Sequence, residues 1–118
     1  MTKSERATAI VTGSSRGVGA STAIKLASKG WNVTITCSSS EKEAIEVSEE
    51  CKSLGGETLV IKSDVSEEKN CKDVVDQTIK KWGRLDALIN NAGTTKFNAH
   101  ENLSGLTSED FLRLYSVN

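Results

Sequence analysis

The chain has 118 residues, the length of one domain of ordinary size. Its 15 lysine and arginine residues nearly balance 16 aspartate and glutamate residues, so the net charge provides no basic surface for nucleic acid or for an acidic membrane. Hydrophobic residues make up 36% of the chain, and no apolar run approaches the ~20 residues of a membrane-spanning helix, so a globular protein that binds neither partner is expected.

Short apolar runs alternate along the chain with longer stretches of helical periodicity. Residues 7–12 are rich in β-formers and end at Gly13, which predicts a buried strand. Apolar side chains then recur at helical spacing over residues 17–29, and Gly30 is the expected end of that helix. A valine, an isoleucine and two threonines predict a second strand over residues 32–37.

The middle of the chain repeats this alternation. Ser40, followed three residues later by Glu43, forms a capping box and predicts a helix that ends at Gly55. The side chains expected on the buried face of this helix are Ala44, Val47, Cys51 and Leu54. A third strand is expected over residues 58–62.

A third helix and a fourth strand follow. Ser66 is the expected N-cap of this helix, and the two glutamates after it favour the positive end of the helix dipole. Its buried stripe is expected to comprise Cys71, Val74, Val75, Thr78 and Trp82. Gly83 ends the helix, the fourth strand covers residues 85–89, and residues 107–110 cap a last helix.

This order of strands and helices predicts an α/β protein. Strands that are continuous apolar runs between helices are typical of a parallel sheet covered on both faces. Right-handed crossovers then give a Rossmann-type, doubly wound half-sheet with strand order 3-2-1-4 in a three-layer α/β/α arrangement. No linker or repeat divides residues 1–118, so a single domain is expected.

The strongest functional signal lies in the turn between the first strand and the first helix, Thr12-Gly13-Ser14-Ser15-Arg16-Gly17-Val18-Gly19. A phosphate-binding turn needs a backbone that can approach a diphosphate closely and free N–H groups at a helix N-terminus. Gly13 allows a sharp turn, and Gly17 and Gly19 allow the close approach. Ser14 and Ser15 add hydroxyl donors. An ordinary βα turn is the alternative, but the position at the start of a helix favours phosphate binding.

The spacing T-G-x-x-x-G-x-G resembles that of the short-chain dehydrogenase/reductase family, and three further stretches resemble the family in the same order. They are Asp64-Val65 after the third strand, Asn90-Asn91-Ala92-Gly93 after the fourth strand, and Val117-Asn118 on the last helix. The four motifs extend over nearly the whole chain. The first and third of them are similar to those of bacterial 3-oxoacyl-(acyl-carrier-protein) reductases.

The resemblance implies a site for a nicotinamide dinucleotide. The residues expected to bind it are Gly13, Ser14, Ser15, Arg16, Gly17, Val18 and Gly19 at the diphosphate, Cys37, Ser38 and Ser39 at the adenosine ribose, Asp64 and Val65 at the adenine, and Asn91, Ala92 and Gly93 at the nicotinamide ribose. Three structural alternatives stay open: a helix cap for Asp64, a turn that only admits positive φ for residues 91–93, and an ordinary polar residue on an exposed helix for Asn118.

The end of the second strand indicates which dinucleotide is bound. An acidic side chain there would accept hydrogen bonds from the ribose hydroxyls and repel a 2′-phosphate, but the position is Cys37, and no carboxylate occurs before Glu41. Arg16 offers a guanidinium to that phosphate, with a solvated surface arginine as the alternative. This pattern resembles the NADP-preferring members of the family, so NADP(H) is expected, with NAD(H) as the alternative. The Cys37 thiol is expected to be a small strand-end hydrophobe rather than a reactive group.

The resemblance also implies a reaction. In the family, a tyrosine whose pKa is lowered by a lysine four residues later exchanges a proton with the substrate oxygen, a serine donates a hydrogen bond to that oxygen, and an asparagine holds a water of the proton relay. Only the asparagine has a counterpart here, Asn118, because Tyr115 is not followed by the lysine. Residues 1–118 are therefore expected to be the cofactor-binding half of an enzyme that interconverts a small-molecule ketone and a secondary alcohol, truncated before the catalytic serine, tyrosine and lysine.

Two other classes of function are alternatives to this one. A non-catalytic fragment that binds a dinucleotide or a partner chain is the main alternative, and methyl transfer from S-adenosylmethionine is disfavoured because it would need an acid at the position of Cys37. Three cysteines without C-x-x-C spacing and a lone His100 disfavour a metal site or a disulfide framework and favour a reducing cytoplasm. A homo-oligomer is expected from the family resemblance alone.

Overall fold

The computed structural model describes residues 4–15, 17–64 and 68–90. These ranges contain four strands and three helices in strict alternation: β1 (Thr8–Thr12), α1 (Gly17–Ser28), β2 (Asn32–Cys37), α2 (Glu41–Ser53), β3 (Glu57–Lys62), α3 (Glu68–Trp82) and β4 (Ala87–Asn90). The predicted order of elements is confirmed as far as β4. The expected last helix lies outside the described residues.

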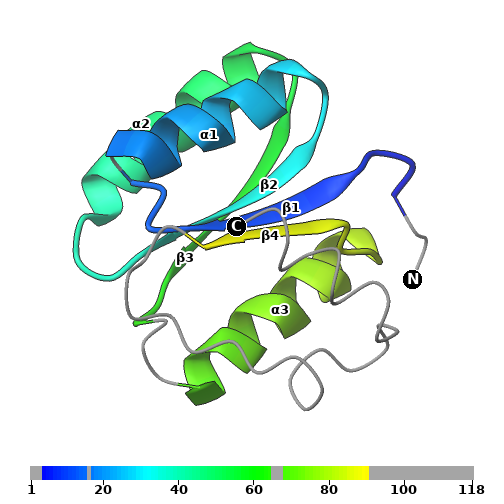
Figure 1. Cartoon of the computed structure of the whole chain (residues 1–118). Helices are drawn as coiled ribbons and strands as arrows, with labels where there is room; N and C mark the ends of the chain where they lie inside the picture. Colours follow the sequence, from blue (N-terminus) through cyan, green and yellow to red (C-terminus); the bar gives the residue numbers. More distant parts are fainter. Residues whose placement is uncertain (1–3, 16, 65–67, 91–118) are drawn as a thin grey trace.

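The described strands are all parallel and form one sheet with the order β3-β2-β1-β4, which confirms the predicted topology. Helices α1 and α2 cover one face of this sheet, and α3 covers the other (Figure 1). Because helices on both faces exclude water from the central strands, every residue of β1 and β2 is buried. Strand β3 lies at an edge and keeps most of its residues partly or fully exposed.

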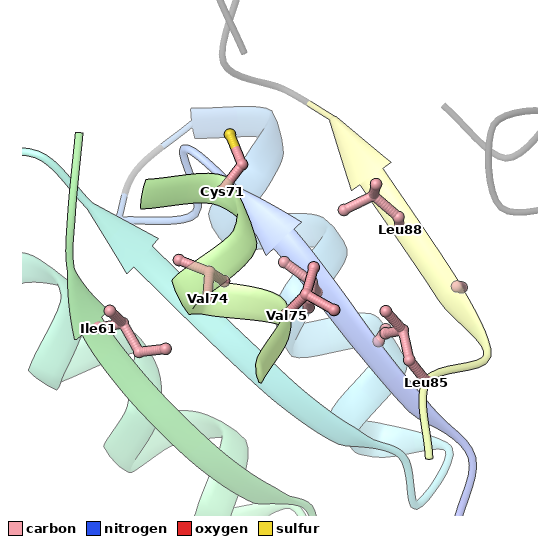
Figure 2. Packing of buried hydrophobic residues seen from close by; sticks show 9 residues of the cluster. Ile61, Cys71, Val74, Val75, Leu85 and Leu88 are labelled. Atoms are coloured by element: carbon pink, nitrogen blue, oxygen red, sulfur yellow. The ribbon is translucent and has the colours of Figure 1, made fainter. Parts of the chain in front are cut away.

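The core consists of two clusters, one on each face of the sheet. Figure 2 shows the cluster under α3, in which the labelled side chains are Ile61, Cys71, Val74, Val75, Leu85 and Leu88. The whole predicted stripe of α3 is buried. In the second cluster, the buried helical members are small: Ala23, Ala27, Ala44 and Cys51. In the described ranges, no helix is both long and apolar enough to cross a membrane.

Two predictions for α2 are wrong in detail. Ser40 is the N-cap residue, but its side chain makes no capping hydrogen bond. Its backbone (φ −94°, ψ 56°) is not in the extended conformation that directs a side-chain oxygen toward the first-turn amides. Leu54, expected on the buried face, is the C-cap residue and is 46% exposed, whereas Ser48 is buried on that face.

Strand β4 begins at Ala87, two residues later than predicted. The Asp86 carboxylate accepts a hydrogen bond from the amide of Thr8 at 2.8 Å and two from the guanidinium of Arg84 at 2.7 Å each. These hydrogen bonds to Asp86 also raise the pKa of Arg84. The amide of Asp86 also donates to the carbonyl oxygen of Thr8 at 2.8 Å, and the regular ladder with β1 starts at the next residue, where Ala87 pairs with Ala9.

Candidate functional site

The carboxyl ends of the parallel strands bring several of the predicted site residues to one edge of the sheet. Residues 13–15 follow β1, Ser38 and Ser39 follow β2, and Asp64 follows β3. In doubly wound sheets, ligands bind at this edge. The described part of the predicted site is therefore gathered in one place by the topology alone.

The turn after β1 depends on two glycines with left-handed backbone angles. Gly13 and Gly17 both have φ of 62°, a conformation that side chains with a Cβ rarely adopt. A Cβ at Gly17 would meet no atom within 4 Å, so the space beside the start of α1 is open. Gly13, Gly17 and Val18 are exposed, and Val18 is 74% exposed. The backbone of the turn is therefore accessible at the carboxyl ends of the strands.

Gly19 has a different function in the same turn. It is buried, and a Cβ at this position would overlap the carbonyl oxygen of Gly13. The turn and the first coil of α1 are in direct backbone contact, which only a glycine permits. This contact explains why the third glycine of the motif stands two residues into the helix.

The start of α1 is an electrostatically favourable place for an anion. The first N–H groups of a helix have no partner inside the helix, and the helix dipole makes this end positive. The first turn of α1 contains no acidic residue that would neutralise it. Backbone N–H groups and the dipole together can hold a phosphate here.

Ser14 does not supply the hydroxyl donor that was predicted. Its side chain is fully buried, and its Oγ donates to the carbonyl oxygen of Val11 at 2.6 Å and accepts from the amide of Thr36 at 3.1 Å. A hydroxyl has one proton to donate, so this prediction is wrong for Ser14. Ser15 is half-buried. Thr36 was not predicted as a site residue, because its role depends on where β2 lies relative to the turn.

The end of β2 presents hydroxyls and no carboxylate. The side chain of Cys37 is 3% exposed and packs in the core, as predicted for a strand-end hydrophobe, while Ser38 and Ser39 are exposed. Burial raises the pKa of the Cys37 thiol, and the Glu41 carboxylate raises it further, so the thiol is neutral near pH 7. The polar surface at this end is therefore formed by the two serines.

A lysine that the sequence did not single out lies beside this end. Lys62 is the partner of Cys37 in the β2–β3 register, it is exposed, and its charge partly offsets the upward shift of the thiol pKa. The amide of Ser63 donates to the carbonyl oxygen of Cys37 at 2.8 Å, which keeps the two strand ends together. The strand register was the information needed to find Lys62.

Asp64 is exposed at the end of β3, and its carbonyl oxygen accepts a hydrogen bond from the Asn70 side chain at 2.9 Å. The remaining predicted residues lie outside the described ranges: Arg16, Val65, Asn91, Ala92, Gly93 and Asn118. The same holds for His100. Among the residues that the structure does describe, no three histidine, cysteine, aspartate or glutamate side chains come together, and the three cysteines are free.

Comparison with known proteins adds independent information. A family model described as short chain dehydrogenase matches residues 7–118. The chain is 37% identical over 110 residues to a short-chain dehydrogenase/reductase of Pestalotiopsis microspora, which covers 93% of this chain and 40% of that protein. It is 40% identical over 90 residues to a 3-oxoacyl-(acyl-carrier-protein) reductase of Staphylococcus epidermidis. That match covers 76% of this chain and 37% of the reductase.

Solved structures of short-chain dehydrogenases/reductases are also similar to this chain. A short-chain dehydrogenase/reductase from Burkholderia xenovorans has a TM-score of 0.74 and 36% sequence identity, with 98% of this chain and 48% of that chain covered. The chain spans less than half the length of these relatives.

Proposed function

Since this chain belongs to the short-chain dehydrogenase/reductase family, we propose that it is the cofactor-binding half of an NADP(H)-dependent oxidoreductase. The reaction proposed is the interconversion of a small-molecule ketone and a secondary alcohol. The 118 residues form one unit in this proposal, and the catalytic serine, tyrosine and lysine of the family belong to a further part of a longer protein. A cytoplasmic location and a homo-oligomer are part of the same proposal and rest on the family resemblance.

The observation that carries the proposal is the exposed glycine turn at the start of α1. A diphosphate needs close access to N–H groups and no competing carboxylate, and the open space beside Gly17 and the first turn of α1 meet both needs. The turn therefore fits the group. Residues 15–19 would hold the diphosphate through their backbone.

The preference for NADP(H) is supported by the charges near the end of β2. Ser38 and Ser39 offer hydroxyl donors, Lys62 adds a positive charge, and Arg16 would add a guanidinium from the turn. The first carboxylate that follows Ser39 along the chain is that of Glu41, the first residue of α2. Its charge is negative, opposite to the charges of Lys62 and Arg16. A 2′-phosphate would gain hydrogen bonds from the two serines and attraction from Lys62 and Arg16, and the Glu41 carboxylate would repel it.

The bound nicotinamide supplies the hydride in this chemistry. The residues of this chain would bind and orient it. Asp64 and Val65 would border the adenine, and Asn91 to Gly93 would let the backbone pass close to the nicotinamide ribose. Asn118 would hold a water molecule of the proton relay, which is the role of the corresponding asparagine in the family.

The experiment that tests the proposal is an activity assay of the complete gene product beside the 118-residue chain. NADPH and NADH oxidation would be followed with a panel of small ketones. The complete protein is expected to turn over with NADPH preferred, and the chain alone is expected to be inactive. Coenzyme binding without turnover of any ketone by the complete protein would instead favour a non-catalytic dinucleotide-binding module.

A further inference from the structure

We propose that Ser14 and Thr36 form a positioning device that holds the glycine turn in its ligand-binding conformation. Three hydrogen bonds, which we call the Ser14–Thr36 clamp, join the turn to β2. The amide of Gly13 donates to Thr36 Oγ1 at 3.2 Å, the amide of Ser14 donates to the Thr36 carbonyl oxygen at 3.3 Å, and the amide of Thr36 donates to Ser14 Oγ at 3.1 Å. The amide, the carbonyl and the hydroxyl of Thr36 are thus all hydrogen-bonded to two residues of the turn, Gly13 and Ser14.

The clamp lies where the regular sheet no longer holds the chain. The β1–β2 register ends with the pair Val11 and Ile35, so the turn beyond it has no ladder with β2. Ser14 is fully buried and Thr36 is 1% exposed, so water does not compete for the hydrogen bond between the Thr36 amide and Ser14 Oγ, whereas the bond from the exposed Gly13 is partly buried. The hydroxyl of Ser14 also donates to Val11 at 2.6 Å, which ties the turn back to β1.

The clamp also determines which N–H groups remain for a ligand. The amides of Gly13 and Ser14 are directed to Thr36 and are not available to an anion. On its other side, the Gly13 carbonyl is in contact with Gly19. Since the turn is held from both sides, the N–H groups of the first turn of α1 are fixed in place before a ligand arrives, which lowers the entropic cost of binding.

The position of Thr36 also affects a second part of the same site, the end of β2. It is the residue directly before Cys37, Ser38 and Ser39, which form the end of β2. One residue therefore positions both the diphosphate turn and the segment proposed to face the adenosine ribose. This inference rests on the proposed function, because it assigns the clamp to coenzyme binding.

The test compares Thr36→Val with a matched control on the same strand, in the complete gene product. Thr34 is fully buried, and its hydroxyl bonds to that of Thr78 in α3 at 2.7 Å, away from the turn. Thr34→Val therefore also removes a threonine hydroxyl and its hydrogen bond, but one that does not involve the turn. Thr36→Ser keeps the hydroxyl and serves as the rescue, and Ser14→Ala tests the clamp from its other side if Thr36→Val folds poorly.

Dissociation constants for NADPH and NADH are measured by calorimetry, together with KM and kcat. Thr36→Val is expected to weaken both coenzymes by roughly fivefold, because a hydrogen bond of this kind contributes a factor of that order, and to raise KM more than it lowers kcat. Thr36→Ser restores binding. Thr34→Val lowers the melting temperature without a change in coenzyme affinity.

A second readout needs no coenzyme. Amide hydrogen exchange at Gly13, whose amide loses its acceptor, is expected to be faster in the coenzyme-free Thr36→Val protein and unchanged in Thr34→Val. Equal coenzyme affinities of Thr36→Val and the unaltered protein, or an equal loss in Thr34→Val, would overturn the inference. If the unaltered protein binds neither coenzyme, the proposed function fails, and unchanged exchange at Gly13 would separately refute the clamp.

Discussion

Gly19 lies against the carbonyl group of Gly13, so close that a Cβ on residue 19 would overlap the carbonyl oxygen. Gly19→Ala is therefore expected to push the turn away from α1 and to destabilise the protein by about 1–3 kcal/mol, the usual range for overpacking. Coenzyme affinity should fall with it, for both coenzymes alike. Urea denaturation and calorimetry measure the two effects, with the exposed Ser21→Ala on the same helix as the control. A change in stability below about 0.5 kcal/mol would contradict the close contact.

Arg16 is proposed to bind the 2′-phosphate, which only NADP(H) carries. Arg16→Ala is therefore expected to weaken NADPH far more than NADH, by about 1–3 kcal/mol for the loss of a charge-assisted hydrogen bond. Kd values for both coenzymes measure this difference, and Lys25→Ala, an exposed residue of α1, is the control. Equal losses for the two coenzymes would refute the role of Arg16.

Lys62 is proposed to add a weaker, longer-range attraction at the same end of the coenzyme. Lys62→Gln is expected to raise KM for NADPH about two- to fivefold at low ionic strength, as for an exposed ion pair, and to leave KM for NADH unchanged. Because salt screens exposed charges, the difference should disappear near ~1 M salt. The exposed Lys42→Gln in α2 is the control. A loss that does not depend on salt would show that Lys62 acts through packing instead.

The buried Cys51 predicts how stability depends on pH. Burial raises the pKa of its thiol to about 11, whereas an unhindered cysteine has a pKa near 9.0. Above pH 9 the unfolded chain releases this proton more readily than the folded protein, so the stabilisation is complete below pH 9 and is lost as pH rises toward 11. The loss is of the order of 2 kcal/mol.

This dependence is measured by urea denaturation between pH 7 and 11, with Cys51→Ala as the comparison. The variant is expected to have a flatter profile above pH 9, whatever its stability at pH 7. Parallel profiles of the two proteins would show that Cys51 ionises equally in both states.

The fold was predictable because its signals are local or follow from chain order. The stripe from Cys71 to Trp82 marks the buried face of α3 by spacing alone, and alternating strands and helices leave few topologies once crossovers are right-handed. Details at the ends of α2 were wrong because they depend on single backbone angles. A capping sequence at Ser40 does not fix its ψ angle, and Leu54 follows the spacing of the helix yet lies at its exposed end.

The site was predictable only in part. The sharp turn at Gly13 could be predicted from the spacing of the glycines, but Gly19, expected to allow close approach of a ligand, instead lies against the carbonyl group of Gly13. Thr36 and Lys62 were missed because each acts across strands, and neither contact is visible before the register of β2 is known. The inward direction of the Ser14 hydroxyl was missed for the same reason.

The central assignment is the first turn of α1 as the site of a dinucleotide diphosphate. The most direct measurement is a crystal structure of the complete gene product soaked with NADPH. Electron density for the diphosphate is expected against the backbone of residues 15–19, with the 2′-phosphate near Ser38. Density for the coenzyme elsewhere on the protein, with the turn occupied by another ligand or by solvent alone, would contradict this assignment.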